Sequence, residues 1–280
     1  MATGFIANAD LRREVEEADI ILLHNAKLIK LLKKHARKSW IVNHSGKLRH
    51  LEKAAGVIFI SEQAKQRFLK TGAKPDVATH VIPHAFHLTP TPHSKPRITK
   101  PIKFIAAGRM VKKKGFSDLI DAAIKLRARA EAFSVTIYGH GPEYEPLKAQ
   151  IEAAEMTNIH LPGWTRELPA QLEDADMFCL PSHKEPFGLV LGEAMAKSLP
   201  VIAAKTDGSL QIFGDEMPHE RGGFLYEARD IDALSRHMEY ALDNPDALRA
   251  LGHAARGRIE SDFSLDKLAA NLRRLLMPLK

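Results

Sequence analysis

The chain has 280 residues, 45% hydrophobic and 27% charged, which is enough for one large domain or two of ordinary size with a substantial core. Its single cysteine, Cys179, excludes an intramolecular disulfide and suits a reducing compartment. No apolar run approaches the roughly 18 residues of a membrane-spanning helix, and the N-terminus lacks the basic start and apolar core of a secretory signal. We therefore expect a cytoplasmic protein.

The formal net charge of +7 is unevenly distributed. Residues 1–97 contain 17 Lys and Arg against 8 Asp and Glu, a net charge of +9, whereas the remainder has 24 against 26, a net charge of −2. A basic first third indicates either an anionic partner or simply a solvated basic surface. Because aromatic residues do not interleave with the charges, we expect no nucleic acid partner. A phosphate-bearing lipid or the inner face of an anionic membrane fits better.

Short apolar runs alternate with amphipathic stretches in the first third of the chain. Ser61 is placed to cap a helix that follows it. The pattern predicts strands at Ile20–Leu23, Trp40–Val42, Val57–Ile60 and His80–Ile82, with helices around Lys27–Lys38 and Glu62–Lys70.

A proline-rich segment, residues 88–101, then reads as a linker, and the alternation restarts after it. Apolar runs predict strands at Ile102–Ala106, Ser134–Tyr138, Ile159–Leu161, Met177–Leu180 and Val201–Ala204. Helical patterns cover Ser117–Ala130, Tyr144–Glu155, Leu189–Ala196 and Leu265–Leu276. Such alternation is typical of α/β proteins with parallel sheets. We predict two Rossmann-like domains, the first of them short, with Cys179 as a buried strand residue. The boundaries are residues 1–88, a linker at 89–101, a second domain at 102–262 and a C-terminal helix within 263–280.

Two glycine-containing turns follow predicted strands of the second domain. The first, GRMVKKKG, places Arg109 and Lys114 after Gly108, a pairing that suits a diphosphate, although a basic surface turn would look the same. The second, GHGP, has Gly139 and Gly141 ahead of a helix. It is not a dinucleotide-binding fingerprint, because Tyr144 occupies the third glycine position.

The stretch HKEPFGLVLGEAMA places one glutamate on each side of a Pro-Phe-Gly turn. Glu185 precedes the turn and Glu193 lies in the apolar helix after it, while Phe187 and Gly188 offer backbone N–H groups at the helix start. Paired carboxylates suit a polyhydroxyl ligand. The simpler reading, a helix acid favoured by the dipole, explains Glu193 alone but not both acids in so apolar a setting.

Four stretches together resemble family 4 of the retaining GT-B glycosyltransferases. They are ISEQAKQRFLKTG with VIPHAF, GRMVKKKGFSDLIDAA, YGHGPEYEPLK and EPFGLVLGEAMAKSLPVIAA, in the order that the family shows. The resemblance runs from about Ala18 to the C-terminus and implies a GT-B fold of two Rossmann-like domains, the first incomplete. This family normally opens with further β-α units, so the chain is either a fragment or a minimal variant that completes its first domain by pairing with another copy.

The resemblance also implies roles for individual residues. Arg109 and Lys114 would bind the donor diphosphate, and Gly108, Gly139 and Gly141 would also belong to the donor site. Glu193 would bind the ribose, Glu185 the transferred sugar, and Phe187, Gly188 and Leu189 would contribute through their backbone. His44, in WIVNHSG, matches a histidine that faces the donor sugar, and His24 is a weaker candidate.

The implied reaction moves a sugar from a nucleotide diphosphate sugar to a glycan or lipid-linked acceptor with retention, as in cell-envelope synthesis. Because cationic side chains and helix N-termini would stabilise the leaving diphosphate, we expect no metal and no further cofactor. One departure from the family, the segment Lys205–Gln211, puts the sugar choice or the activity in question. A catalytically inert nucleotide-sugar-binding module and a membrane-binding adaptor are the competing interpretations.

Overall fold

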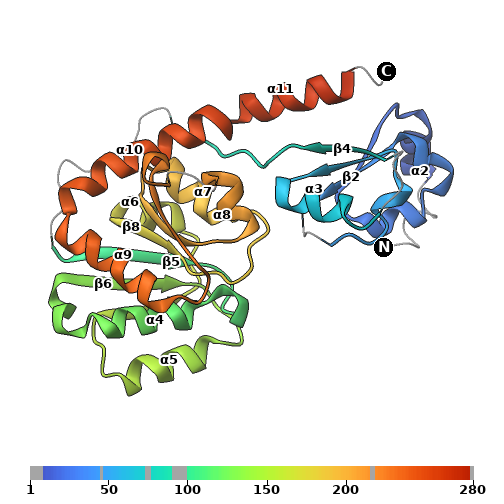
Figure 1. Cartoon of the computed structure of the whole chain (residues 1–280). Coiled ribbons are helices and arrows are strands. Elements are labelled where there is room, and N and C mark those ends of the chain that lie inside the picture. Colours follow the sequence, from blue (N-terminus) through green and yellow to red (C-terminus); the bar gives the residue numbers. More distant parts are fainter. Residues whose placement is uncertain (1–8, 45–46, 73–76, 90–99, 215–217, 278–280) are drawn as a thin grey trace. The chain divides into compact units, whose positions relative to one another are not determined.

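The computed structural model describes residues 9–44, 47–72, 77–89, 100–214 and 218–277. The chain divides into two compact units. The first consists of residues 1–84 together with 266–280, and the second of residues 85–265 (Figure 1). The linker predicted at 89–101 lies largely outside the described residues.

Four parallel strands form the sheet of the first unit. Their order follows the chain: β1 (Ile21–Leu23), β2 (Ser39–Asn43), β3 (Gly56–Phe59) and β4 (Ala78–Val81). Every residue of β3 is buried, as expected of an inner strand, whereas β4 alternates between exposed and half-buried residues at the sheet edge. Gly56 is required where Trp40 crosses β3, because a β-carbon there would overlap the indole ring.

Helices and short 3-10 turns surround this sheet. They are α2 (Ala9–Glu17), η1 (Ala26–Lys30), η2 (Lys33–Lys38), η3 (Leu51–Lys53) and α3 (Glu62–Leu69). The predicted cap is confirmed, since the Ser61 hydroxyl accepts a hydrogen bond from the Ala64 N–H at 3.3 Å. A core of Leu23, Ile41, Val57, Phe59 and Phe68 fills the space between these elements and the sheet.

The prediction of one helix over Lys27–Lys38 is wrong, because this segment forms the separate 3-10 helices η1 and η2. A continuous α-helix would place Lys30 within one turn of both Lys27 and Lys34, where like charges destabilise a helix. The two short turns instead bury Ile29 and Leu32 in the core.

The C-terminal helix α11 (Leu265–Leu276) packs on the first unit. Leu268, Leu272 and Leu275 recur at helical spacing, so they share one face of α11. They contact a cluster formed by Trp40, Ile58 and Ile82. Helix α11 therefore completes the hydrophobic core of the first unit, whose other elements come from residues 1–84.

The second unit contains a six-stranded parallel sheet of strand order β10-β9-β8-β5-β6-β7. The strands are β5 (Ile102–Ala107), β6 (Phe133–Tyr138), β7 (Ile159–Gly163), β8 (Met177–Leu180), β9 (Val201–Ala204) and β10 (Gly223–Tyr226). The chain adds β6 and β7 on one side of β5 and then crosses to place β8 on the other. Open α/β sheets bind ligands at the carboxyl ends of the strands at such a switch point.

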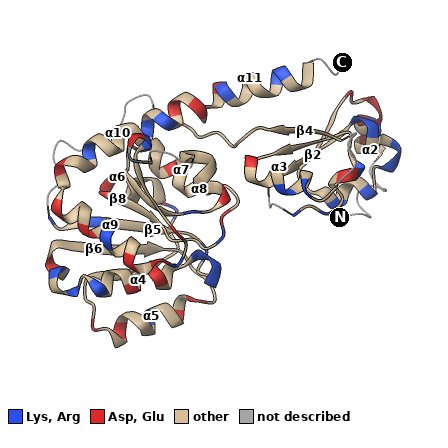
Figure 2. Ribbon diagram, viewed as in Figure 1, with Lys and Arg blue, Asp and Glu red and all other residues tan. Residues whose placement is uncertain are grey.

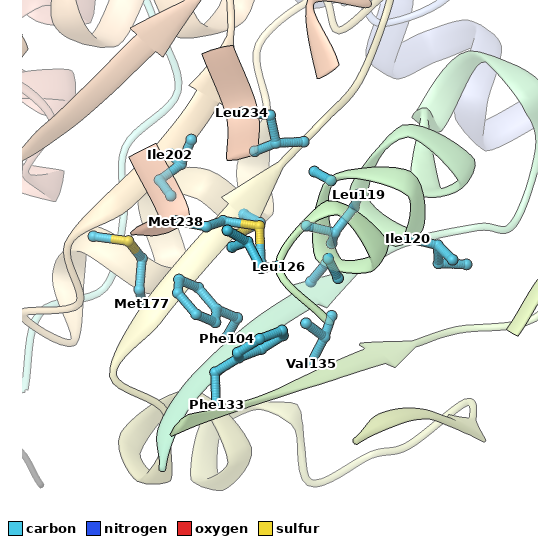
Figure 3. Close-up of a cluster of buried hydrophobic side chains, with 14 of the residues drawn as sticks. Phe104, Leu119, Ile120, Leu126, Phe133, Val135, Met177, Ile202, Leu234 and Met238 are labelled. Carbon is cyan, nitrogen blue, oxygen red and sulfur yellow. The ribbon is translucent and has the colours of Figure 1, made fainter. Parts of the chain in front are cut away.

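Helices lie on both faces of this sheet (Figure 1). They are α4 (Phe116–Lys125), α5 (Tyr144–Ala153), α6 (Leu168–Asp174), α7 (Leu189–Ala196), α8 (Asp207–Phe213), α9 (Ile231–Asp243) and α10 (Pro245–Asp262), with 3-10 turns η4 (Lys112–Lys114), η5 (Arg127–Ala132) and η6 (Pro218–Arg221). Figure 3 shows the main core, in which Phe104 and Ile202 of the sheet meet Leu119 of α4 and Leu234 and Met238 of α9.

The predicted strands of the second domain are all present, and the strands Met177–Leu180 and Val201–Ala204 match residue for residue. Cys179 is a buried strand residue, as predicted, and burial raises the pKa of its thiol. Strand β10 was not predicted. The helix expected to reach Ala130 ends at Lys125 and continues as η5. No helix within the described ranges is long and apolar enough to cross a membrane.

Candidate active site

Three turns of the second unit follow strands that are neighbours in the sheet. GRMVKKKG comes after β5, GHGP after β6 and HKEPFG after β8. Since β5 lies between β6 and β8 and all three strands are parallel, the turns meet at one edge, at the switch point. The fold thus brings together motifs that are up to about 80 residues apart in the chain.

The first two turns lie directly against each other. The N–H of Met110 donates to the carbonyl of His140 at 3.0 Å. Gly139 and Gly141 have φ of 141° and 159°, and a β-carbon on either would overlap a carbonyl oxygen, that of Gly108 or of Met110 respectively. Glycine is therefore required by backbone packing at both positions, a structural reason that stands beside the proposed approach of a ligand.

Lys114 and Glu185 form an ion pair across this edge, with 2.5 Å between Lys114 Nζ and Glu185 Oε2. Only 16% and 14% of their side chains are exposed. The turn that delivers Lys114 ends at Gly115 in a left-handed conformation (φ 65°). Two residues assigned to separate parts of a donor thus contact each other. Arg109, in the same turn as Lys114, is exposed.

The chain passes from a buried to an exposed residue over the three positions at the start of α7, Phe187 to Leu189. The Phe187 ring is buried and stacks on Phe86 with centroids 6.0 Å apart, so only its backbone is left to meet a ligand. Gly188 then takes a left-handed conformation (φ 82°) at the N-cap of α7. The next residue, Leu189, is 50% exposed.

Glu193 lies four residues after Leu189, so both side chains occupy the same face of α7. The opposite face is buried. Glu193 is exposed by surface area, yet neighbouring protein atoms desolvate its carboxyl group and raise its pKa. A ligand can therefore reach a carboxylate that is incompletely solvated, a favourable setting for accepting hydrogen bonds from hydroxyls.

Sequence reasoning missed a second contact between side chains of these turns. His183 Nε2 lies 2.7 Å from Asp118 Oδ2, and the His183 N–H donates to the Lys113 carbonyl at 2.8 Å. Asp118 sits in the first turn of α4, directly after the GRMVKKKG loop. His183 therefore ties that loop to the turn carrying Glu185. Its place at the start of HKEPFG was the one available signal.

The atypical segment Lys205–Gln211 forms the capped N-terminus of helix α8 rather than an open loop. Thr206 caps α8 in a capping box with Ser209. The Gly208 N–H donates to the Glu185 carbonyl at 2.9 Å, and a β-carbon on Gly208 would overlap the backbone of Phe187. This segment therefore packs against the backbone of the turn between the two glutamates and hydrogen-bonds to it.

The remaining predicted residue, His44, belongs to the first unit, where it is the middle of three stacked imidazoles. His44 Nε2 lies 2.7 Å from His24 Nδ1, and His44 Nδ1 lies 3.3 Å from His84 Nε2. The ring centroids are 5.0 and 5.1 Å apart. Burial, and then the neighbouring imidazole charge, lowers the pKa of both His44 and His84. His84 was not predicted.

The chain contains two Asp-x-Asp sequences, which the expectation of a metal-free site did not take into account. In Asp230-Ile231-Asp232, Asp230 caps α9 and Asp232 pairs with Lys125 Nζ at 2.7 Å. The other sequence is Asp174-Ala175-Asp176. Asp174 pairs with Lys103 Nζ at 2.8 Å, and Asp176 accepts from the Lys103 N–H. These acids precede β8, at the opposite edge from the three turns, so they serve the structure there. Among the residues that the structure describes, no three His, Cys, Asp or Glu side chains are arranged to hold a metal ion.

Comparison with known families decides the class of protein. The sequence model described as "Glycosyl transferases group 1" matches residues 90–258, more than half of the chain. The chain belongs to this family.

Curated relatives of this chain are named for several different activities. Over 180 residues it is 33% identical to a glycogen synthase of Mycobacterium tuberculosis, covering 62% of this chain and 42% of the relative. It is 30% identical to the putative colanic acid biosynthesis glycosyltransferase WcaL of Salmonella typhimurium, covering 63% and 45%. A GDP-mannose-dependent phosphatidylinositol monomannoside mannosyltransferase of M. tuberculosis is 26% identical, with coverage of 77% and 60%. The chain thus spans about half the length of these relatives.

Solved structures show the same fold at lower identity. Anabaena HepE, solved in complex with UDP, superimposes with a TM-score of 0.82 at 20% identity, covering 96% of this chain and 81% of that one. Sucrose-phosphate synthase of Thermosynechococcus elongatus gives 0.79 at 20% identity, with 99% and 78% covered. The two parallel sheets and these neighbours confirm the predicted GT-B class of two Rossmann-like domains.

Proposed function

We propose that this group 1 glycosyltransferase is a retaining enzyme of family 4 that moves a sugar from a nucleotide diphosphate sugar to an acceptor hydroxyl. The observation that carries the proposal is the Lys114–Glu185 ion pair at the switch point, with the glycine turns beside it and Glu193 on α7. The cation suits a diphosphate, the two carboxylates suit hydroxyls, and the glycine turns let a ligand approach the backbone closely. Together they match a ligand that carries both a diphosphate and hydroxyls.

The assigned roles follow from charge and reach. Arg109 and Lys114 would hold the diphosphate and stabilise the charge that develops on it as the glycosidic bond breaks. Glu193 would accept hydrogen bonds from the ribose hydroxyls, and Glu185, freed from Lys114 or shared with it, from those of the sugar. His44 stays the candidate for contact with the transferred sugar. Neither Glu185 nor another residue is assigned as a covalent nucleophile.

The donor site needs no metal in this proposal, because the cationic side chains supply the charge that a metal would supply. We further propose an acceptor in cell-envelope glycan synthesis. Two relatives are named for colanic acid and for phosphatidylinositol mannoside synthesis, which supports this choice. One relative is named as GDP-mannose-dependent, whereas the HepE structure was solved in complex with UDP, so the nucleotide must be measured.

A thermal-shift screen of the full chain against UDP-, GDP- and ADP-sugars tests donor binding. The nucleotide sugar that raises the melting temperature is then assayed for release of nucleoside diphosphate, and NMR of the product reports the anomeric configuration. Inversion would refute the assignment to retaining enzymes. A donor that binds but never turns over, with any acceptor offered, would make the chain a nucleotide-sugar-binding module.

A further inference from the structure

The carboxyl edge of the first sheet holds a cleft of about 810 Å³, a size typical of small-molecule sites. Its walls come from residues 24–27 after β1, from the end of β2 with His44 (residues 41–44), and from residues 47–51. All of its lining residues belong to the first unit. The cleft is thus a property of that unit alone.

The chemistry of the lining is one-sided. None of the described lining residues is acidic, and six of the thirteen carry basic or imidazole side chains: His24, Lys27, His44, Lys47, Arg49 and His50. Residues 25–53 as a whole contain nine Lys and Arg against one Glu (Figure 2). Three of these nine, Lys27, Lys47 and Arg49, line the cleft. The segment that carries most of the excess positive charge of the first third thus also supplies the cations of this concave site.

The backbone at the cleft is held in an uncommon conformation. His50 has φ 71° and ψ 2°, which is left-handed and costly for a residue other than glycine. The fully buried Leu51 anchors it from the next position. Desolvation lowers the pKa of His50, and the positive charges of Lys30, Lys53 and Arg49 lower it further. Burial of Leu51 therefore holds this loop in a strained conformation, and the charges around His50 are mainly positive.

Arginine and lysine together recognise phosphate well, because the guanidinium offers a planar fork and the ammonium a compact charge. Asn25 and the imidazoles of His24 and His44 line the same cleft and can hydrogen-bond to hydroxyls. The lining thus combines an anion-binding part with a hydroxyl-binding part, which fits a small phosphorylated polyol better than it fits an uncharged glycan.

We propose that this cleft binds the phosphate of a phosphorylated polyol or sugar, either free or as the headgroup of a lipid, through Lys27, Lys47 and Arg49. This molecule would be the acceptor, a statement that rests on the proposed function. The binding itself does not depend on it.

The test uses the full chain and two probes that carry the same chemistry. Calorimetry measures binding of sn-glycerol 3-phosphate, with glycerol as the phosphate-free control. Flotation measures binding to phosphatidylcholine vesicles with and without phosphatidylglycerol. A response to glycerol 3-phosphate identifies a free phosphate compound as sufficient, and a response to the anionic vesicles alone identifies a lipid headgroup.

A matched pair of double variants separates the cleft from general charge. Lys27→Ala/Arg49→Ala removes one lysine and one arginine from the lining, and Lys34→Ala/Arg37→Ala removes the same residue types from the exposed surface of η2. The first should weaken binding about tenfold or more. The second should weaken it less than about twofold, because Lys34 and Arg37 do not line the cleft and act on a ligand there only through a screened long-range attraction. Equal effects of the two, or no binding of either probe by the native chain, would overturn the proposal.

Failure of this proposal can be told apart from failure of the proposed function. Apart from His44, which the double variant leaves in place, the residues assigned to the donor lie in the second unit. Lys27→Ala/Arg49→Ala should therefore keep any thermal shift caused by a nucleotide sugar. That shift also shows that the variant is folded. If no nucleotide sugar shifts the native chain, the proposed function fails while phosphate binding is still measurable.

Discussion

The carboxyl edges of the two sheets differ in whether their basic side chains have acidic partners. In the second unit Lys114 is paired with Glu185, and His183 with Asp118, within turns that glycines hold together. In the first unit the cleft is lined by lysine, arginine and histidine, with no acid among its described members. The second edge combines a mostly buried basic side chain with an acidic partner, whereas the first presents basic side chains with no acid in the described lining. Similar α/β scaffolds can thus present very different sites, because the turns after the strands carry the chemistry.

The largest effect is expected where backbone packing defines the second edge. Gly139→Ala would place a β-carbon into the Gly108 carbonyl, in addition to strain at a φ of 141°. We expect a loss of about 3 kcal/mol in unfolding free energy, measured by urea denaturation. Gly257→Ala is the control, since Gly257 faces open space within α10, and it should gain about 0.5–1 kcal/mol. Equal stability of the two variants would refute the packing argument.

The ion pair comes next. Lys114→Met leaves the mostly buried Glu185 carboxylate without its cation, which should cost about 1–3 kcal/mol of stability and abolish donor-induced thermal shifts. The neighbouring Lys113 is exposed, and Lys113→Met should change neither quantity measurably. Retention of the thermal shift in Lys114→Met would mean that the pair is purely structural.

Glu193 should affect binding without affecting the fold. Its carboxyl group is desolvated in the protein, so Glu193→Gln removes a partly unfavourable charge and should leave stability unchanged or slightly higher. Donor affinity should fall about tenfold, the value of one lost charge-assisted hydrogen bond. Titration of the shifting nucleotide sugar measures it, with Glu131→Gln on the exposed η5 as the control. An unchanged affinity would remove Glu193 from the site.

The smallest effect is a pH dependence confined to the first unit. Folding lowers the pKa of His44, His50, His80 and His84 below the ordinary value near 6.5. The unfolded chain therefore binds more protons as pH falls through and below that value, and the first unit should lose stability there.

The two tryptophans of the chain, one in each unit, make this pH dependence measurable. Trp40 is buried in the first sheet, whereas Trp164 is 68% exposed in the second unit. In a Trp164→Phe background, Trp40 fluorescence should report a urea midpoint that decreases from about pH 7.5 to about pH 5. Replacing His84 with Gln should flatten this slope. A midpoint that rises on acidification would contradict the sign of the shifts.

Local sequence determined the elements with strong patterns. The apolar runs of β8 and β9, the helix Leu189–Ala196 and the Ser61 cap were readable because alternation, burial and capping depend on residues close in the chain. The motif turns could be placed at one sheet edge for the same reason, since the carboxyl ends of parallel strands meet there. The domain boundaries, the roles of the individual site residues and the homo-oligomer stay predictions.

Tertiary structure alone decided which side chains meet. Lys114 and Glu185 are 71 residues apart, and the contact between His44 and His84 spans 40, so no local pattern encodes either. The Phe187 ring turned inward because Phe86 offered an apolar partner. The basic segment became two 3-10 turns because tertiary burial of Ile29 and Leu32 outweighed its helical pattern. Sequence specified which chemistry each strand end carries, and packing over long separations determined which of those charges are neutralised and which stay open to a ligand.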